Sequence, residues 1–385
     1  SREAMVTSPA PARTPPPSFG EAKNRRQKVR AAGLHPDYWY PVAHSHEIKA
    51  GKAIEVKFWR RSFAVFRGAD GQLRAIDNRC AHRQLKLTLG EVDKHNQLVC
   101  PYHGWCYNGQ GQVVHIPHEL FGRSMPNFQV PSYAVRERYG LVWLFPGDPN
   151  LAQTRALPEI PELTGPDAWA CVPVDFVWKA HHSMIIDNVS DFTHEYLHRK
   201  YKPFSDARLT RLETEGDKVH VEYDTHVGGG KISGLFVNRE KANTGHMKLC
   251  YEYPYQWSNT GDKIKHHCFV LPIDERTTRA FFLFYFDALR VPFTRIDIPQ
   301  RVLSVILKIA NPIMVRPLLR EDGFAMEAEQ EGYEAHHDQP IAELNPAVAH
   351  FQALTIRKWE EHLARSATTL VPLARPACAE PVSAS

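Results

Sequence analysis

Two short segments each carry one cysteine and one histidine in positions that suit a metal centre. One residue separates Cys80 from His82, and two residues separate Cys100 from His103. Two thiolates can bind one iron of a [2Fe–2S] cluster while two imidazoles bind the other. A structural zinc ion accepts the same four donors, although zinc sites more often have like ligands in each segment. The spacing predicts a metal centre and favours the iron–sulfur cluster over zinc.

A second set of polar residues follows a helical period further along the chain. Asp187, Asp191, His194 and His198 are separated by four, three and four positions, which predicts one shared face on a helix over residues 182–198. Buried acids and imidazoles need a partner, and a metal ion can supply one. Two histidines and one carboxylate with open positions are typical of Fe(II) oxygenases. On spacing alone, a solvated polar helix face remains the alternative.

The residues around both sets resemble those of the Rieske non-haem iron oxygenases. Segments 78–83 (NRCAHR) and 100–105 (CPYHGW) are similar to the two Rieske boxes of that family, and segment 39–42 (WYPV) resembles the start of its Rieske domain. Segment 188–198 (NVSDFTHEYLH) is similar to its mononuclear-iron motif, except that three residues separate the histidines where many members have four. The resemblance covers roughly residues 38–365.

The resemblance also implies the metal ligands. The first set would bind the [2Fe–2S] cluster, and His194 and His198 would bind the mononuclear iron together with an acidic residue on a late helix. Asp322 fits that place in the segment Arg320 to Glu327. Three other acids are rivals for it: Glu321, Glu327 and Glu329.

Asp191 would have a different role by the same resemblance. It would bridge His194 to His103 of the partner subunit, orienting the ligand imidazole and offering a route for electrons. The working unit would then be a homotrimer with a three-fold axis. A ferredoxin, an NAD(P)H-dependent reductase or both would supply electrons, because the sequence contains no G-x-G-x-x-G dinucleotide motif and no flavin signature.

The elements around these residues indicate two domains. Residues 38–148 carry short apolar segments between turn signals, which predicts a small β domain. Residues 149–365 combine helical and strand-like segments. The resemblance implies an α+β fold, with an antiparallel β Rieske domain followed by a helix-grip (START/Bet v1-like) catalytic domain built on a curved antiparallel sheet. Residues 1–37 and 366–385 are expected to form a mobile leader and a disordered tail.

Strands are predicted at 53–58, 63–67, 73–76, 140–145, 218–224, 247–253, 266–271 and 279–286, and helices at 302–307, 321–334 and 348–364. Phe282, Phe284 and Phe286 alternate along the last of these strands. They would point to one face, either in a substrate pocket or in the core. The apolar segment 302–315 could pack in the core, line substrate access or contact a membrane surface.

The predicted activity is that of a terminal oxygenase component. It would use O2 and external electrons to hydroxylate or oxidatively dealkylate a small hydrophobic cyclic substrate that is aromatic, polycyclic or sterol-like. The single-polypeptide length resembles the monooxygenating and dealkylating branch of the family. A cis-dihydroxylating dioxygenase is the main alternative. A Rieske electron carrier and a zinc-stabilised ligand-binding module are more remote.

Composition excludes several other classes of protein. The 385 residues carry a net charge of +4, which gives no case for nucleic-acid binding. Seven cysteines form no disulfide framework, and this favours a reducing, cytoplasmic location. The most apolar stretch, 302–319, is interrupted by charged residues and prolines, so no integral membrane anchor is predicted.

Overall fold

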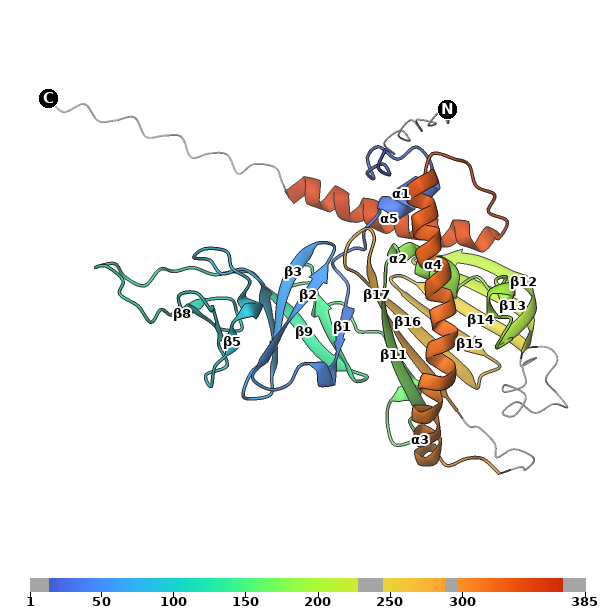
Figure 1. The fold of residues 1–385 in the computed structure, drawn as a ribbon, viewed down its shortest axis with the longest axis horizontal. Helices are drawn as coiled ribbons and strands as arrows, with labels where there is room; N and C mark the ends of the chain where they lie inside the picture. Colours follow the sequence, from blue (N-terminus) through green and yellow to red (C-terminus); the bar gives the residue numbers. More distant parts are fainter. Residues whose placement is uncertain (1–13, 228–244, 288–295, 370–385) are drawn as a thin grey trace, which may run out of the picture.

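The computed structural model describes residues 14–227, 245–287 and 296–369. The strands of these residues form three antiparallel sheets, and a long helix crosses one face of the largest (Figure 1). This is the α+β architecture that the family resemblance implies: an N-terminal β part followed by a curved sheet with helices.

The N-terminal part contains a six-stranded sheet in the order β1-β10-β9-β4-β3-β2 and a four-stranded sheet in the order β5-β6-β7-β8. The six strands are β1 (Tyr40–His44), β2 (Lys52–Phe58), β3 (Arg61–Arg67), β4 (Leu73–Asp77), β9 (Ser132–Arg138) and β10 (Leu141–Phe145). The small sheet contains β5 (Glu91–Val92), β6 (Leu98–Val99), β7 (Cys106–Tyr107) and β8 (Val113–His115). The four strands predicted here are confirmed as β2, β3, β4 and β10. Strands of two or three residues are too short for a readable period.

The largest sheet has seven antiparallel strands in the order β11-β17-β16-β15-β14-β13-β12. They are β11 (Ala170–Trp178), β12 (Phe204–Glu215), β13 (Lys218–Val227), β14 (Gly245–Glu252), β15 (Tyr255–Thr260), β16 (Ile264–Pro272) and β17 (Thr278–Phe286). One face packs on the N-terminal part, where the ring of Trp143 meets that of Phe269 edge-on at 4.9 Å. The other face is left for the helices and the site.

A continuous helical stretch covers that second face. It consists of α3 (Gln300–Ala310), a π-helical turn (Asn311–Val315) and α4 (Arg316–His336). Pro312 and Pro317 remove backbone donors from the α-helical ladder, which accounts for the irregular turn between the helices. Among the residues that the structure describes, this 37-residue stretch alone is long and apolar enough to cross a membrane by length and composition. In the fold, however, α4 packs on the sheet and buries Asp322 and Met326.

The prediction that residues 1–37 form a mobile leader is wrong for the part of them that the structure describes. Residues 25–31 form helix α1 (Arg25–Ala31), whose Asn24 side chain accepts the backbone N–H of Gln27 at 2.9 Å. Arg30 is buried and lies 3.0 Å from the carboxylates of both Asp187 and Glu329. A basic run looks solvated in the sequence because its acidic partners come from distant segments.

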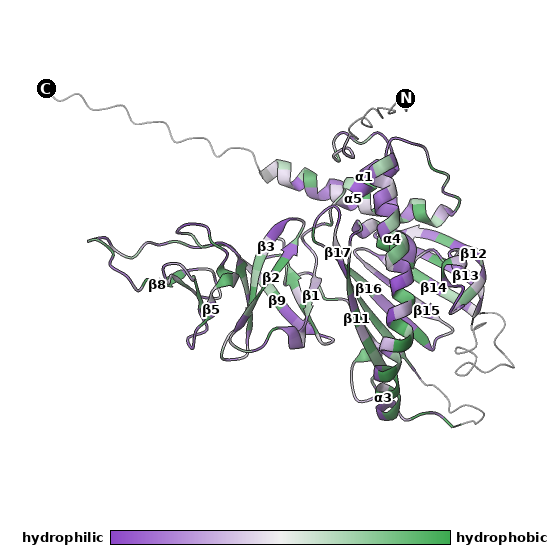
Figure 2. Cartoon of the chain, viewed as in Figure 1, coloured by the Kyte–Doolittle hydropathy of each residue, from purple (hydrophilic) through white to green (hydrophobic). Residues whose placement is uncertain are grey.

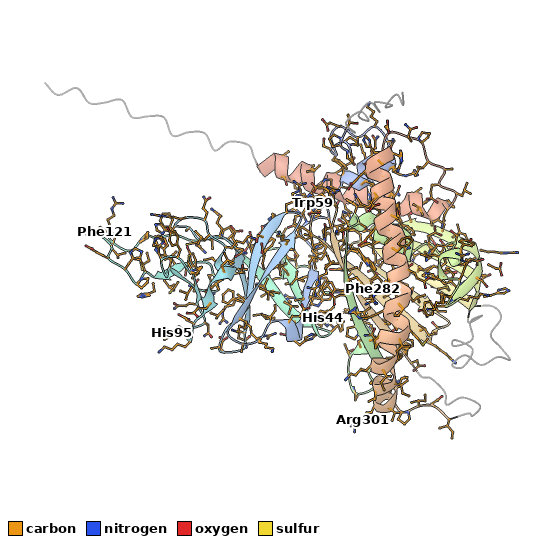
Figure 3. The ribbon with its side chains drawn as sticks, in the orientation of Figure 1. His44, Trp59, His95, Phe121, Phe282 and Arg301 are labelled. Carbon is orange, nitrogen blue, oxygen red and sulfur yellow. The ribbon has the colours of Figure 1, made fainter. Side chains whose placement is uncertain are left out.

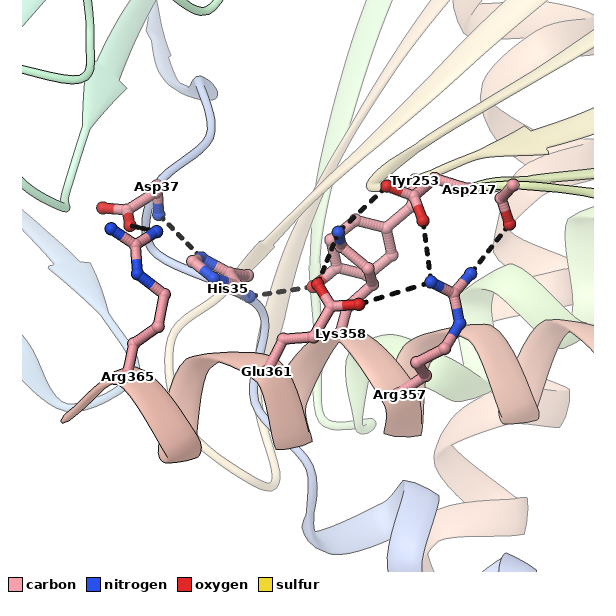
Figure 4. A network of polar contacts seen from close by, with 9 residues as sticks. His35, Asp37, Asp217, Tyr253, Arg357, Lys358, Glu361 and Arg365 are labelled. Carbon is pink, nitrogen blue, oxygen red and sulfur yellow. Dashed lines mark hydrogen bonds and ion pairs between the residues drawn. The ribbon is translucent and has the colours of Figure 1, made fainter. Parts of the chain in front are cut away.

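Basic side chains of the last helix, α5 (Pro346–Thr369), bind acidic residues from two distant segments of the chain (Figure 4). Arg365 donates to Asp37 at 3.1 Å, and Arg357 donates to Asp217 at 2.9 Å. The helix continues beyond the predicted end at residue 364, so the tail expected from 366 begins as helix. Residues 370–385 lie outside the described part of the chain.

Candidate metal centres

The two cysteine–histidine loops lie side by side at the small sheet. Cys80 follows β4, Cys100 follows β6, and each loop turns back through a backbone hydrogen bond to its cysteine carbonyl, at 2.9 and 3.1 Å. Both thiols are buried. Nδ1 of His82 lies 3.1 Å from Nδ1 of His103 in an exposed pair. The structure therefore pairs the cysteines inside and the histidines at the surface.

This arrangement fits a [2Fe–2S] cluster. Two imidazoles whose Nδ1 atoms face one another at 3.1 Å need a shared proton or a shared metal between their lone pairs. Burial raises the pKa of the Cys100 thiol, so a bound cation is needed to hold it as thiolate. Two sulfur donors inside and two nitrogen donors outside are the donor set of a Rieske cluster.

Two aromatic residues support these loops, and the sequence did not single them out. The Tyr107 hydroxyl lies 3.1 Å from Sγ of Cys80 and accepts the Ala81 N–H at 2.8 Å. The Trp105 ring stacks on His82 with centroids 4.8 Å apart. Trp105 is the last residue of the second cluster segment and Tyr107 lies two residues beyond it, and this proximity was the only available signal.

The second set does not lie on one helix. Helix α2 (His182–Val189) ends before Asp191, and a 3₁₀ helix (Glu195–His198) follows a turn, with His194 at its N-cap. The Asp191 carboxylate accepts both the N–H and the hydroxyl of Thr193, a local bond that competes with the helical ladder. The predicted helix over residues 182–198 is therefore wrong beyond Val189.

His194, His198 and Asp322 nevertheless converge. Nε2 of His198 lies 3.1 Å, and Nε2 of His194 lies 3.4 Å, from the same Oδ1 of Asp322. One ligand atom from each residue lies within 4.8 Å of the other two. Two imidazoles and a buried carboxylate at these distances fit one metal ion with positions left open.

The charges of this site favour a cation. Burial disfavours a charged imidazole, but the Asp322 and Glu321 carboxylates outweigh it and raise the pKa of His198. Burial likewise disfavours a charged Asp322, yet His194 and His198 keep the pKa of that carboxyl below its usual value. A metal ion would supply the positive charge in place of a proton.

The three rival acids have other positions. Glu321 Oε2 lies 3.4 Å from Nδ1 of His198, on the side of the ring away from Asp322, where a carboxylate can orient a ligand imidazole. Glu327 accepts a backbone N–H at 3.0 Å, and Glu329 pairs with Arg30. Only Asp322 faces both imidazoles among the described acids.

Asp187 and Asp191 do not share the face of the histidines. Asp187 pairs with Arg30 at 3.0 Å, and Asp191 accepts the side-chain amide of Asn345 at 2.9 Å. Among the described residues, Asp191 receives no hydrogen bond from His194. The expected contact depended on a helix that continues through both residues, and that helix is absent.

An apolar cavity of about 240 Å³ adjoins the two histidines and Asp322. Phe282 and Phe284 of β17 line it, whereas Phe286 is not among the described residues that do. Its polar lining includes Ser258 and His266, on strands where no pattern distinguished them in the sequence. The cavity and the three converging residues His194, His198 and Asp322, which we call the triad, therefore form one site beneath α4.

This fold with these two centres defines a class of protein, and comparison with known proteins identifies it. Residues 38–131 match the Rieske [2Fe-2S] domain, and residues 178–366 match the vanillate O-demethylase oxygenase C-terminal domain. The chain belongs to the Rieske non-haem iron oxygenases. It is an oxidoreductase that carries a Rieske cluster and a mononuclear non-haem iron and uses O2, so an electron carrier and a zinc module are excluded.

The chain is similar to several named oxygenases. The chain is 44% identical over 340 residues to the 4beta-methylsterol monooxygenase of Methylococcus capsulatus, covering 88% of this chain and 92% of that protein. It is 33% identical over 198 residues to the oxygenase component of dicamba O-demethylase from Stenotrophomonas maltophilia, covering 51% and 54% of the two chains. Dicamba monooxygenase bound to 3,6-dichlorosalicylic acid shares the fold, with a TM-score of 0.71 and 21% identity over 87% of this chain and all of that one.

Proposed function

We propose that this chain is a terminal monooxygenase that hydroxylates a methyl group of a sterol-like, fused-ring substrate. The supporting observation is the 44% identity to a methylsterol monooxygenase over 92% of that protein's length. In such a reaction a methyl group, O2, two electrons and two protons yield a hydroxymethyl group and water. The largely hydrocarbon wall of the cavity suits such a substrate.

The cavity volume limits how such a substrate would bind. At about 240 Å³ it is smaller than the roughly 300–1,000 Å³ of many ligand pockets. A fused four-ring molecule would therefore place only its reacting end inside. Phe282 and Phe284 would pack on that end and exclude water from it.

The side-chain placement supports the metal ligands that we propose. Cluster and iron would be held by Cys80, His82, Cys100 and His103, and by His194, His198 and Asp322, respectively. When bound, the cluster passes single electrons and the iron activates O2. Asp322 would balance the charge, and Glu321, whose Oε2 lies 3.4 Å from Nδ1 of His198, would orient that ring. We place the boundary between a Rieske domain (38–148) and a catalytic domain (149–365) at the connection before β11.

Electrons would come from a ferredoxin or an NAD(P)H-dependent reductase and pass between copies in a homotrimer. The end of the Rieske part marked by His95 and Phe121 lies far from Phe282 of the cavity (Figure 3). The exposed His82–His103 pair is therefore better placed for a neighbour's iron than for its own. Asp191, a partly exposed residue three positions before His194 in the sequence, is our candidate for the receiving residue. The six described cysteines are free, in keeping with a cytoplasmic location.

Oxygen labelling tests the reaction. With 18O2, a reductase system and a 4-methylated sterol, the product should gain one labelled atom while the second appears in water. Two labelled atoms in the product would instead support the dihydroxylating alternative. Absence both of product and of sterol-stimulated reductant oxidation, in protein with cluster and iron intact, would refute the proposal.

Ligand variants test the site. Asp322→Ala should lose the mononuclear iron and turnover but keep the cluster spectrum, whereas Glu327→Ala should keep all three. Asp191→Asn should retain both metals and the trimer but lose turnover. Mixed trimers of Cys100→Ser and His194→Ala chains should recover some turnover. No rescue in verified mixed trimers would contradict transfer between copies.

A further inference from the structure

A chain of polar side chains crosses the apolar cavity wall and takes no part in metal binding. Ser258 of β15 pairs in register with His266 of β16, and its Oγ lies 2.7 Å from Nδ1 of that imidazole. Nε2 of His266 lies 2.9 Å from Oε1 of Gln256, a fully buried residue. Nε2 of Gln256 donates to the carbonyl of Val189 at 3.3 Å.

The partners fix the direction of every hydrogen bond in this chain. The Gln256 amide must present its NH2 to the Val189 carbonyl, so its oxygen faces His266. His266 must therefore donate from Nε2, and its Nδ1 can only accept. Burial lowers the pKa of His266 to about 4, which keeps the ring neutral with one acceptor nitrogen. The Ser258 hydroxyl consequently donates to His266.

The Ser258 hydroxyl can then only accept any further hydrogen bond. Its proton is committed, and its oxygen keeps lone pairs but has no other hydrogen-bond partner among the described residues. Ser258 is 4% exposed and lines the same cavity as His194 and Asp322. A buried acceptor of this kind matches a ligand group that can donate and opposes one that can only accept.

We propose that Ser258 Oγ accepts a hydrogen bond from a ring hydroxyl of the substrate, so that the site selects a cyclic alcohol over the corresponding ketone. This inference rests on the proposed function and deepens it. A sterol carries its ring hydroxyl on the carbon next to the one that bears a 4-methyl group. Holding the hydroxyl at Ser258 would keep that methyl group inside the small cavity that the triad adjoins. A ketone would place its oxygen against the serine lone pairs.

Binding of a matched pair of ligands tests this selection. The probes are a 4-methylated 3-hydroxysterol and its 3-ketone, with affinities read by calorimetry and kcat/KM by product formation. The native enzyme should prefer the alcohol by about tenfold or more, since a site with an unpaired polar group rejects the mismatched ligand strongly. Ser258→Ala should abolish the preference by weakening the alcohol. Thr260→Val, which alters another hydroxyl of the same strand and cavity, should preserve it.

A second variant tests the role of the imidazole. His266→Phe removes the acceptor that holds the serine proton, so Ser258 becomes free to donate, and ketone binding should improve relative to alcohol. Equal affinity for both ligands in the native enzyme, or an unchanged preference in Ser258→Ala, would overturn the inference while leaving sterol oxygenation intact. Preferred binding of the alcohol without any oxygenation would instead support the subsite and refute the proposed function.

An independent observation concerns the outer face of α3. Val302, Val305, Ile309 and Ile313 are 49, 56, 62 and 63% exposed. Their spacing of three, four and four positions places them on one side of the helical stretch. Figure 2 shows α3 as a hydrophobic element at one end of the molecule, away from α1 and α5. We call these four residues the α3 stripe.

The charges around the α3 stripe suit an anionic lipid surface. Residues 300–320 contain no acid, and Arg301, Lys308 and Arg320 are exposed basic residues among them. We infer that the α3 stripe binds a membrane surface with anionic head groups, lying in its interface rather than crossing it. The stretch continues into Leu318, which lines the cavity. An apolar substrate dissolved in the bilayer would then be close to the site.

Co-sedimentation with vesicles tests this surface. Native enzyme should pellet with vesicles of phosphatidylcholine and phosphatidylglycerol, weakly with phosphatidylcholine alone, and less at high salt. Ile309→Asp should reduce binding about tenfold or more, while Leu344→Asp, at a 90% exposed position outside the stripe, should not. Absence of lipid binding, or a change of oligomeric state in Ile309→Asp with lipid binding retained, would overturn the inference; the latter would indicate a second copy on the stripe.

Discussion

Gly323 offers a sharp test of how the iron site is positioned, because it follows Asp322 on α4 and packs against Trp178 of β11. A Cβ atom at Gly323 would lie 2.3 Å from Nε1 and 2.7 Å from Cε2 of that ring. Ordinary contacts begin near 3.4 Å, so Gly323→Ala requires a displacement of 3.4 − 2.3 = 1.1 Å. The Trp178 ring is buried and stacked on Phe176 at 5.0 Å, so we expect α4 to move instead.

That movement should affect the site more than the fold. Overpacking costs about 1–3 kcal/mol, and replacing a helical glycine with alanine recovers about 1 kcal/mol. The net loss of stability should therefore be roughly 0–2 kcal/mol. Asp322, however, would shift from its 3.1 Å contact with His198. A misplacement of about 1 Å at a reacting centre can cost on the order of a hundredfold in rate.

The assay compares iron content, cluster spectrum and turnover in matched variants. Gly323→Ala should lose mononuclear iron and about a hundredfold in kcat/KM, with the cluster spectrum unchanged. Gly332→Ala is the control, because it lies on the same helix with no described atom within 4 Å of its added Cβ. Adding Trp178→Phe to Gly323→Ala should restore part of the iron. Full iron and turnover in Gly323→Ala, or equal damage in Gly332→Ala, would refute this reasoning.

Three further predictions address stability, redox potential and pH. Arg30→Met should cost about 3–5 kcal/mol in urea unfolding because it leaves the buried Asp187 carboxylate without a cationic partner, whereas Lys28→Met, at a side chain that is 38% exposed, should cost little. Tyr107→Phe should lower the cluster potential by tens of mV in voltammetry, because its bond to Cys80 favours the more negative reduced cluster; an unchanged potential would contradict this. Burial lowers the pKa of His182 to about 3 and of His267 to about 3. Between about pH 3 and the ordinary histidine pKa of about 6.5, the unfolded chain therefore binds more protons than the folded chain. Stability should therefore be greatest above about pH 6.5 and fall as pH drops toward 4, by about 1.4 kcal/mol per pH unit for each group; flat unfolding curves between about pH 7 and pH 5 would exclude this.

Much of the fold was predictable because strands alternate and long helices repeat. The strands predicted at 218–224, 266–271 and 279–286 are present in β13, β16 and β17. β11 and β12 were not predicted, since β11 follows a proline-rich connection and more than half of β12 is exposed. The prediction of a mobile leader was wrong for another reason. Burial of Arg30 depends on its ion pair with Asp187, which is distant in the sequence and which no local pattern reveals.

For the two centres, the sequence indicated which residues could act as donors but not the backbone path between them. An unbroken helix would place His194 and His198 one turn apart, with Asp191 on the same stripe. The chain instead leaves the helix at Val189, which frees His194 to take a position set by tertiary contacts.

Phe204 of β12 supplies those contacts, because it packs edge-on against both imidazoles, with ring centroids 5.3 Å from His194 and 5.8 Å from His198. A residue on a neighbouring strand thus orients both rings toward Asp322 on a third element. Under this constraint a spacing of three residues between the histidines can serve as well as four, since the turn and the strand, rather than a helical period, determine where the Nε2 atoms lie. The departure from the usual spacing is therefore compatible with a shared metal ion, and it transfers control of the ligand geometry from the helix to the packing of Phe204.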